Sequence, residues 1–104
     1  MAKSVLPFNI KGRCYICHAQ CETDEHHIFE GANRKASDKY GLTVYLCRVC
    51  HRRAHDFPKE FEEKYHLKRM TQIAAMAHYG WDIKQWRRLF RKDYRNNYIR
   101  EYNK

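Results

Sequence analysis

The sequence has no long apolar run. No stretch of about 18 apolar residues occurs in its 104 residues, so we expect no transmembrane helix and no membrane partner. Residues 1–13 lack the apolar segment that a secretory signal peptide needs. Internal repeats and low-complexity segments are also missing. These absences predict one small domain, spanning residues 1–104, that stays in the cytoplasm.

Acidic side chains are scarce beside basic ones. The chain has 12 Asp and Glu residues against 21 Lys and Arg residues, which gives a net charge of +9. A small basic domain commonly binds polyanions, and nucleic acid is the partner that this charge first suggests. Contact with ribosomes or acidic proteins, or solubility alone, would explain the same charge.

Five cysteines are present, and four of them form two C-x-x-C pairs, CYIC and CRVC. Because cytoplasmic thiols stay reduced, this spacing favours metal binding over disulfide bonds. Two such pairs supply the four thiolates of a tetrahedral structural Zn²⁺ site. The predicted ligands are Cys14, Cys17, Cys47 and Cys50. Cys21 is then left over as a small buried or idle thiol, and His18 is another spare.

The segment between the two pairs predicts two short strands. Residues 26–29 (HHIF) and 42–47 (LTVYLC) are rich in β-branched, aliphatic or aromatic residues. Residues 30–41 (EGANRKASDKYG) are polar and favour a surface loop. Beyond them, the four-residue spacing of His51 and His55 places both imidazoles on one face of an expected helix, where they can share an ion. Strand, loop, strand and helix form one unit over about residues 13–56.

The sequences HHI and CRVCH, in this order, resemble the landmarks of the HNH nucleases, the ββα-metal group. Members of this family place a histidine at the end of a first strand and a metal-binding histidine early in the helix that follows the second strand. Many carry two C-x-x-C pairs around the motif, the second followed by histidine. The resemblance covers about Cys14–Asp56, and this segment looks most like small phage-encoded members.

The resemblance implies a role for each histidine of the unit. His27 corresponds to the general base, and His26 corresponds to a metal ligand beside it. His51 corresponds to the ligand on the helix. His55 corresponds to an additional ligand of colicin-type DNases, which share the His-His pair and the helical HxxxH spacing.

One position departs from the family pattern. Family members often have Asn five residues before the first cysteine of the second pair, where this chain has Leu42. Asn33 is the residue that we expect to support the loop of the catalytic site instead.

Phosphodiester hydrolysis suits these residue types. An imidazole with an ordinary pKa of about 6.5 can take a proton from water near neutral pH. A single divalent ion held by the three ligand histidines would stabilise charge on the phosphate. An all-imidazole ligand set favours Zn²⁺, Ni²⁺ or Mn²⁺ over Mg²⁺, unless a carboxylate such as Glu30 or Asp56 joins it. Asp56 could equally cap the next helix, with Pro58 in its first turn.

Three arginines near the unit are candidate phosphate contacts through bidentate hydrogen bonds, although each could equally belong to a solvated basic face. They are Arg34, Arg52 and Arg53.

Residues 57–104 predict a helical extension. One helical stretch runs over residues 58–80 and ends at Gly80, and Asp82 caps a second over residues 83–102. Their apolar stripes, expected to pack against the unit or in a homodimer, are Leu67, Met70, Ala74 and Ala77, then Ile83, Trp86, Phe90 and Tyr94. The second helix also carries a candidate DNA-binding face of Arg87, Arg88, Arg91, Lys92 and Arg95. Tyr98 and Tyr102 could stack on unpaired bases or belong to a frayed end.

The sequence therefore predicts an α+β fold, with a zinc-stapled ββα-metal nuclease unit and a helical C-terminal extension. The expected activity is metal-dependent DNA cleavage to 5′-phosphate and 3′-hydroxyl ends, in the bacterial host cell if the protein is phage-encoded. The alternatives are a non-catalytic zinc-containing nucleic-acid-binding module and an assembly partner. Nothing in the sequence separates DNA from RNA, or one DNA structure from another.

Overall fold

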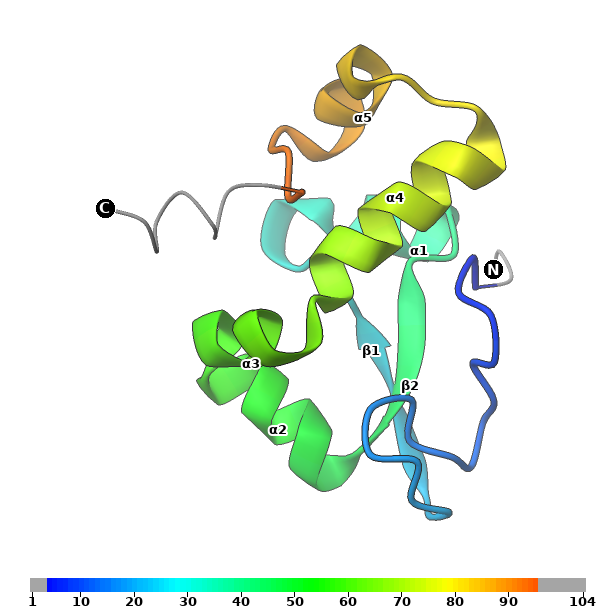
Figure 1. Cartoon of the computed structure of the whole chain (residues 1–104), viewed down its shortest axis with the longest axis vertical. Helices are drawn as coiled ribbons and strands as arrows, with labels where there is room; N and C mark the ends of the chain where they lie inside the picture. Colours follow the sequence, from blue (N-terminus) through cyan, green and yellow to red (C-terminus); the bar gives the residue numbers. More distant parts are fainter. Residues whose placement is uncertain (1–3, 96–104) are drawn as a thin grey trace.

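The computed structural model of the protein describes residues 4–95 and has an α+β fold (Figure 1). Over this range, strands β1 (Thr23–His27) and β2 (Thr43–Cys47) form one antiparallel hairpin, accompanied by five α-helices. The helices are α1 (Arg34–Lys39), α2 (Arg48–Asp56), α3 (Pro58–Tyr65), α4 (Leu67–Tyr79) and α5 (Ile83–Phe90), and a short 3₁₀ helix, η1 (Gly31–Asn33), precedes α1. The predicted fold class is confirmed. Tyr98 and Tyr102 lie outside the described residues.

The two faces of the hairpin have different surroundings. In the register, His26 pairs with Val44 and His27 pairs with Thr43, and neighbouring residues of a strand face opposite sides. His26 therefore shares a face with Val44 and Leu46, which are fully buried. This is the face that α2 covers, while His27 lies on the other side.

The first strand begins earlier than predicted. It starts at Thr23 and ends at His27, whereas Ile28 and Phe29, expected in the strand, leave it and are buried in the core. Phe29 leaves the strand because its backbone groups hydrogen-bond to the Ser37 hydroxyl in place of a neighbouring strand. The Ser37 hydroxyl donates to the Phe29 carbonyl at 2.8 Å and accepts from the Phe29 amide at 3.2 Å.

The prediction of a surface loop over residues 30–41 is wrong, because this segment contains η1 and α1. Its polar composition hides a buried serine, Ser37, whose hydroxyl is satisfied by the backbone of Phe29. Composition alone could not separate a short helix that docks through a serine from a solvated loop. The consequence is that α1 lies beside β1, where it can contribute side chains to a site.

Helix α2 begins at Arg48, ahead of the expected start, because Cys47 caps it: the Cys47 sulfur accepts the amide of Cys50 at 3.4 Å. Asp56 is the last residue of α2 and does not cap α3, so that interpretation is wrong, whereas Pro58 does stand in the first turn of α3.

The predicted continuous helix over residues 58–80 is divided at His66, whose φ of +54° ends α3. Gly80 ends α4 as predicted, with a φ of +69°. The predicted apolar stripe is half correct: Leu67 is buried and Ala74 packs against the core, but Met70 is 49% exposed and Ala77 is exposed. The buried residues of α4 are Leu67, Thr71, Gln72 and Ala75. Hydropathy missed this face because two of its four residues are polar and find their partners inside the protein.

Helix α5 begins as predicted, with a reciprocal capping box between Asp82 and Gln85. Its apolar residues Trp86 and Phe90 are fully buried and lie 5.3 and 5.2 Å from the ring of Phe29. The stripe therefore packs against the ββα unit of the same chain. The helix ends at Phe90, so Tyr94 lies beyond it, although its ring still packs on Phe29 at 4.7 Å.

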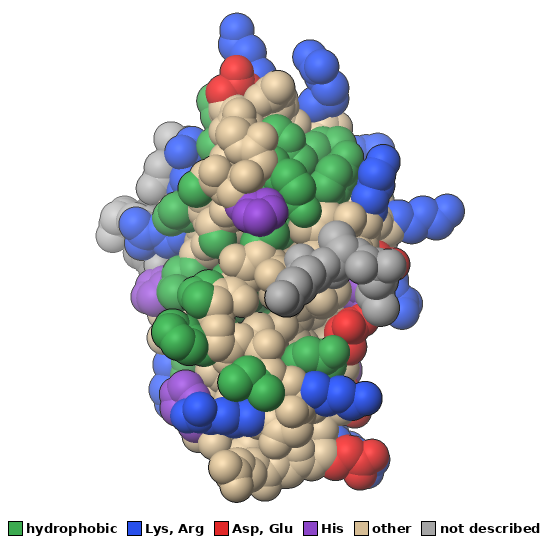
Figure 2. All heavy atoms as spheres, turned by 90° about the vertical axis from the view of Figure 1, so that its right-hand side faces the viewer, with side chains coloured by type: hydrophobic (Ala, Val, Ile, Leu, Met, Phe, Trp, Pro, Cys, Tyr) green, Lys and Arg blue, Asp and Glu red, His purple; other side chains and the backbone are tan. Residues whose placement is uncertain are grey.

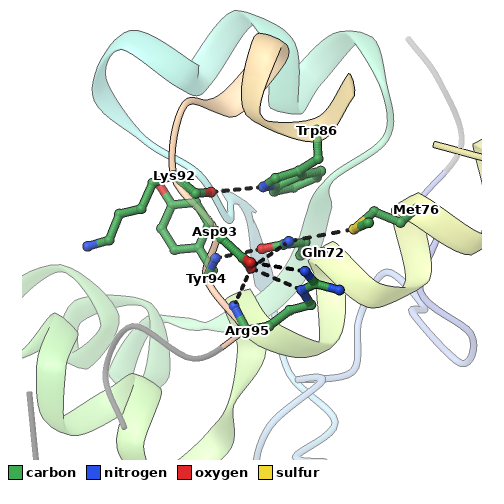
Figure 3. Close-up of polar contacts among 7 residues, drawn as sticks. All are labelled: Gln72, Met76, Trp86, Lys92, Asp93, Tyr94 and Arg95. Atoms are coloured by element: carbon green, nitrogen blue, oxygen red, sulfur yellow. Dashed lines mark hydrogen bonds and ion pairs between the residues drawn. The ribbon is translucent and has the colours of Figure 1, made fainter. Parts of the chain in front are cut away.

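A polar network fixes the segment after α5 to α4 (Figure 3). The Asp93 carboxylate accepts from the Gln72 amide and from the Arg95 guanidinium, each at 3.0 Å. The Tyr94 amide donates to Gln72 at 2.7 Å, and the Trp86 indole donates to the Lys92 carbonyl at 2.9 Å. Placing Arg91, Lys92 and Arg95 on a face of the helix was therefore wrong, because α5 ends at Phe90, and Arg95 pairs with Asp93.

Candidate functional site

Four cysteine sulfurs converge where β2 meets α2. Cys14 and Cys17 come from the loop before β1, Cys47 ends β2, and Cys50 lies in the first turn of α2. Their sulfurs all lie within 4.8 Å of one another, and those of Cys17 and Cys47 are 3.8 Å apart. Tetrahedral Zn²⁺ with bonds of about 2.3 Å separates its sulfurs by about 3.8 Å. The cluster therefore suits a structural metal such as Zn²⁺.

The backbone around the cluster favours a thiolate. Burial raises the pKa of the Cys14 thiol, but backbone N–H groups, those of Cys17 and Cys47 foremost, outweigh it and lower the pKa to about 6. Burial raises the pKa of Cys50, and the neighbouring Cys47 and Cys14 raise it further. Four thiols in this space need a cation before all of them can ionise.

The two spare residues lie apart from this cluster. The Cys21 thiol donates to the Ala19 carbonyl at 3.6 Å and is not among the four converging sulfurs. His18 has a φ of +66° in the turn after Cys17 and joins none of the metal-ligand clusters among the described residues.

Three histidines form a second cluster. His26 on β1 and His51 and His55 on α2 bring ring nitrogens within 4.8 Å of one another. The ring of His26 is 5.1 Å from that of His51 and 5.4 Å from that of His55, centroid to centroid. The spacing of four residues on α2 places its two imidazoles over the same face of the hairpin, as the sequence suggested.

Two carboxylates orient the helix histidines. Nδ1 of His51 lies 3.1 Å from Asp24, and Nδ1 of His55 lies 3.1 Å from Glu30. If both carboxylates accept an N–H, the Nε2 atoms of His51 and His55 carry lone pairs, and these atoms face each other at 3.0 Å. Two lone pairs at this distance repel unless a cation lies between them. Tetrahedral bonds of about 2.0–2.1 Å would separate such nitrogens by about 3.3 Å, so the pair fits an ion after a small adjustment.

His26 is ready to act as a neutral ligand. Burial lowers its pKa to about 3, helped by the neighbouring His51 and His55. Its Nδ1 atom is buried without a hydrogen-bond partner, and the nearest carboxylate, that of Glu30, is 3.7 Å away. An unpaired buried nitrogen is costly, and a bound ion would remove that cost if this nitrogen reached it.

His27 projects from the other face of β1 but lines a cavity that His51 and His55 also line. A cavity of about 370 Å³ is lined by Glu25, His27, Glu30, Gly31, Arg34, His51 and His55. The predicted base and two of the predicted ligands therefore border one opening, together with Arg34. His27 Nε2 lies 3.6 Å from the carboxylate of Asp38 on α1.

The other predicted residues lie elsewhere. The Asn33 amide donates to the Phe90 carbonyl at 3.2 Å, so it ties η1 to α5. Arg53 borders a separate hollow with Phe57 and Phe61. The remaining predicted basic residues are exposed; they are Arg52, Arg87, Arg88, Arg91 and Lys92.

Figure 2 shows one face of the molecule, and Lys and Arg side chains lie along several of its edges. One of these edges is the top, where α5 lies in Figure 1. Positive charge is therefore not confined to α5.

Sequence reasoning missed Asp24, which holds His51, and Asp38, which faces His27. A strand placed at Thr23–His27 would have found the first, because Asp24 and His26 are two residues apart and share a face. No signal in the sequence marked Asp38, since its segment was interpreted as a loop.

Comparison of the chain with protein-family models, with curated proteins and with solved structures gave no match. The arrangement of hairpin, following helix and four-cysteine cluster is consistent with the HNH resemblance. Among the described residues, no helix is both long and apolar enough to cross a membrane.

Proposed function

We propose that the protein is a metal-dependent endonuclease of the HNH type that hydrolyses phosphodiester bonds of DNA. The observation that carries the proposal is the convergence of His26, His51 and His55 on one point, with His27 at the rim of the same hollow. A structural zinc module needs only the four cysteines and has no use for this second cluster. The cluster is also open to a substrate, because the hollow next to it reaches the surface.

The three clustered histidines would hold one divalent ion. When bound, the ion supplies Lewis-acid stabilisation of the charge on the phosphate and on the leaving 3′ oxygen. Asp24 fixes the direction of the His51 ring through Nδ1, and Glu30 does the same for His55. Glu30 lies outside the converging ligand atoms, so the ligand set is all imidazole and favours Zn²⁺, Ni²⁺ or Mn²⁺ over Mg²⁺.

His27 would act as the general base. It lies on the opposite face of β1 from the ligand His26, so it can stay free of the ion while remaining next to it. Its side chain is 19% exposed, which leaves it accessible to water in the hollow. The imidazole takes the proton of the attacking water, and Arg34 on the rim can hold a phosphate oxygen. The expected products carry 5′-phosphate and 3′-hydroxyl ends.

Conversion of supercoiled plasmid to nicked and linear forms, with Zn²⁺, Ni²⁺, Mn²⁺ or Mg²⁺ added in turn, tests the proposal. We expect cleavage that depends on the added ion and is lost at low ion concentration in His51→Ala. The matched control is His78→Ala, which removes an exposed histidine outside the cluster and should cut normally.

Binding of DNA without cleavage under any ion would contradict the proposal and favour the non-catalytic module. Stable oligomers that neither bind nor cut DNA would favour an assembly role instead.

A further inference from the structure

A third group of metal-ligating side chains lies on the face of β1 opposite the three-histidine cluster. Glu25 and His27 are two residues apart on β1 and share this face, and Asp38 approaches them from α1. Their ligand atoms all lie within 4.8 Å of one another, and His27 Nε2 is 3.6 Å from Asp38. Strand β1 and the nearby helix α1 thus bring two carboxylates to one imidazole.

The charge around this group is unbalanced. Among the described residues, no Lys or Arg forms an ion pair with Glu25 or Asp38, although the chain carries a net charge of +9. Glu25 is half-buried and the Asp38 side chain is 45% exposed, and two carboxylates at this short distance repel each other. A cation between them would relieve this repulsion, and the adjoining hollow, lined by Glu25 and His27, gives it a way in.

We propose that Glu25, His27 and Asp38 bind a second divalent cation, of the hard class represented by Mn²⁺. Two carboxylates with one imidazole suit Mn²⁺, whereas the three-histidine cluster suits borderline ions such as Zn²⁺ and Ni²⁺. The two sites therefore differ in the ion that they prefer, although they flank one strand.

The consequence for activity depends on the nuclease function proposed above. A neutral imidazole has one unprotonated nitrogen, so an ion on Nε2 of His27 leaves only a protonated Nδ1. His27 then cannot accept a proton from water. Mn²⁺ should therefore inhibit the cleavage that Ni²⁺ activates through the three-histidine site, because it occupies the base.

The binding test uses the loss of the free Mn²⁺ electron paramagnetic resonance signal, with the structural metal in place. In His51→Ala, which disables the three-histidine site, one Mn²⁺ should still bind, and its paramagnetism should broaden the amide resonances of Glu25, His27 and Asp38. Adding Glu25→Gln or Asp38→Asn should weaken this binding about tenfold or more, because each change replaces one carboxylate ligand by an amide. The control is Glu22→Gln, an exposed carboxylate outside the group, which should bind Mn²⁺ unchanged.

Failure of His51→Ala to bind Mn²⁺, or equal binding by the Glu25→Gln and Asp38→Asn variants, would overturn the inference. Cleavage activated by Ni²⁺ provides a separate readout: added Mn²⁺ should lower its rate in the wild type, and this inhibition should disappear in Asp38→Asn. Specific Mn²⁺ binding without any cleavage would support this site and contradict the nuclease. Cleavage without Mn²⁺ bound at these residues would support the nuclease and contradict the site.

Discussion

His26 and His27 are adjacent in sequence yet face opposite sides of β1. This alternation allows two neighbouring imidazoles to take different roles. His26 is buried beside α2, where burial keeps its pKa at about 3 and its ring neutral. His27 stays partly exposed at the hollow. A one-residue change of strand register would exchange the two environments, so the proposed chemistry depends on the hairpin register.

His27→Ala and His55→Ala should impair cleavage in different ways. Loss of a general base typically costs about 100 to 10,000-fold in rate, with partial recovery at high pH as hydroxide replaces the base. His55→Ala should instead weaken ion binding, so added metal should restore cleavage. The measurement is the cleavage rate against ion concentration and pH, beside calorimetric ion binding.

Both variants should retain the structural metal, which serves as the control for folding. Near-normal activity of His27→Ala, or its rescue by excess metal alone, would show that the base has been assigned to the wrong residue.

The four-residue spacing of His51 and His55 predicted that their imidazoles share one face of a helix, and the resemblance to HNH nucleases added His26 to them. The sequence did not predict Asp24, Glu30 and Asp38 as partners of particular histidines. Those contacts depend on where β1 begins and on how α1 folds back, which local composition does not determine.

At the level of elements, the helix ends marked by a local cap were predicted, whereas the ends at His66 and Phe90 were not. The Asp82 and Gln85 box and the C-terminal Gly80 are local signals that act within one turn. Helix α1 was missed because its docking residue is a serine, buried by a hydrogen bond to Phe29. Helix α4 shows the same limit, since Thr71 and Gln72 occupy core positions.

Neutralising Arg87 and Arg88 on α5 together tests whether this helix binds DNA. Both side chains are exposed, and binding to phosphates does not depend on sequence, so affinity for all DNA sequences should fall alike. The slope of log affinity against log salt should flatten by about 0.9 for each phosphate that the variant no longer neutralises. Fluorescence anisotropy titrations at several salt concentrations would measure it.

The matched control removes two charges outside α5, with Arg13→Gln and Arg48→Gln. An unchanged salt slope in the α5 double variant would assign this face to solubility and not to DNA.

Asp93→Asn should destabilise the joint between α4 and the segment after α5. The ion pair and hydrogen bonds with Arg95, joined by the hydrogen bond from Gln72, hold the pKa of Asp93 well below its usual range, although burial opposes them. A group whose pKa is lower in the folded than in the unfolded state stabilises the protein at pH values above its unfolded-state pKa. This stabilisation is lost as the pH falls through the folded-state pKa. The expected loss is about 1.5–3 kcal/mol near neutral pH, typical of hydrogen bonds to a charged group.

Urea unfolding of the wild type and Asp93→Asn would measure this difference. The difference in unfolding free energy between the two proteins should stay constant from about pH 6 to 8. It should decrease only below about pH 4, where the Asp93 carboxyl of the unfolded chain becomes protonated. A difference that grew or vanished between pH 6 and 8 would assign the effect to another group.

For the whole molecule, the four-cysteine cluster joins segments that are far apart in the chain. It links the loop before β1 to the junction of β2 and α2, which carries the histidine cluster. Structural Zn²⁺ in small domains contributes an apparent binding free energy of about 10–16 kcal/mol, comparable with the entire stability of a typical domain, about 5–15 kcal/mol. The metal should therefore decide whether this small protein folds.

Cys47→Ser should accordingly abolish the bound zinc and unfold the protein, whereas Cys21→Ser should be mild. Zinc content by mass spectrometry and helicity by circular dichroism would measure both effects. Loss of zinc from Cys21→Ser with retention by Cys47→Ser would overturn the assignment of the ligands.

The central claim is that the ββα unit holds an ion among three histidines, separate from the four cysteines. Anomalous diffraction from crystals soaked in Ni²⁺, recorded at the Zn and Ni absorption edges, tests it most directly. We predict a zinc peak among Cys14, Cys17, Cys47 and Cys50, and a nickel peak among His26, His51 and His55. The absence of a nickel peak at the histidines, in crystals whose cysteine site is filled, would contradict the account.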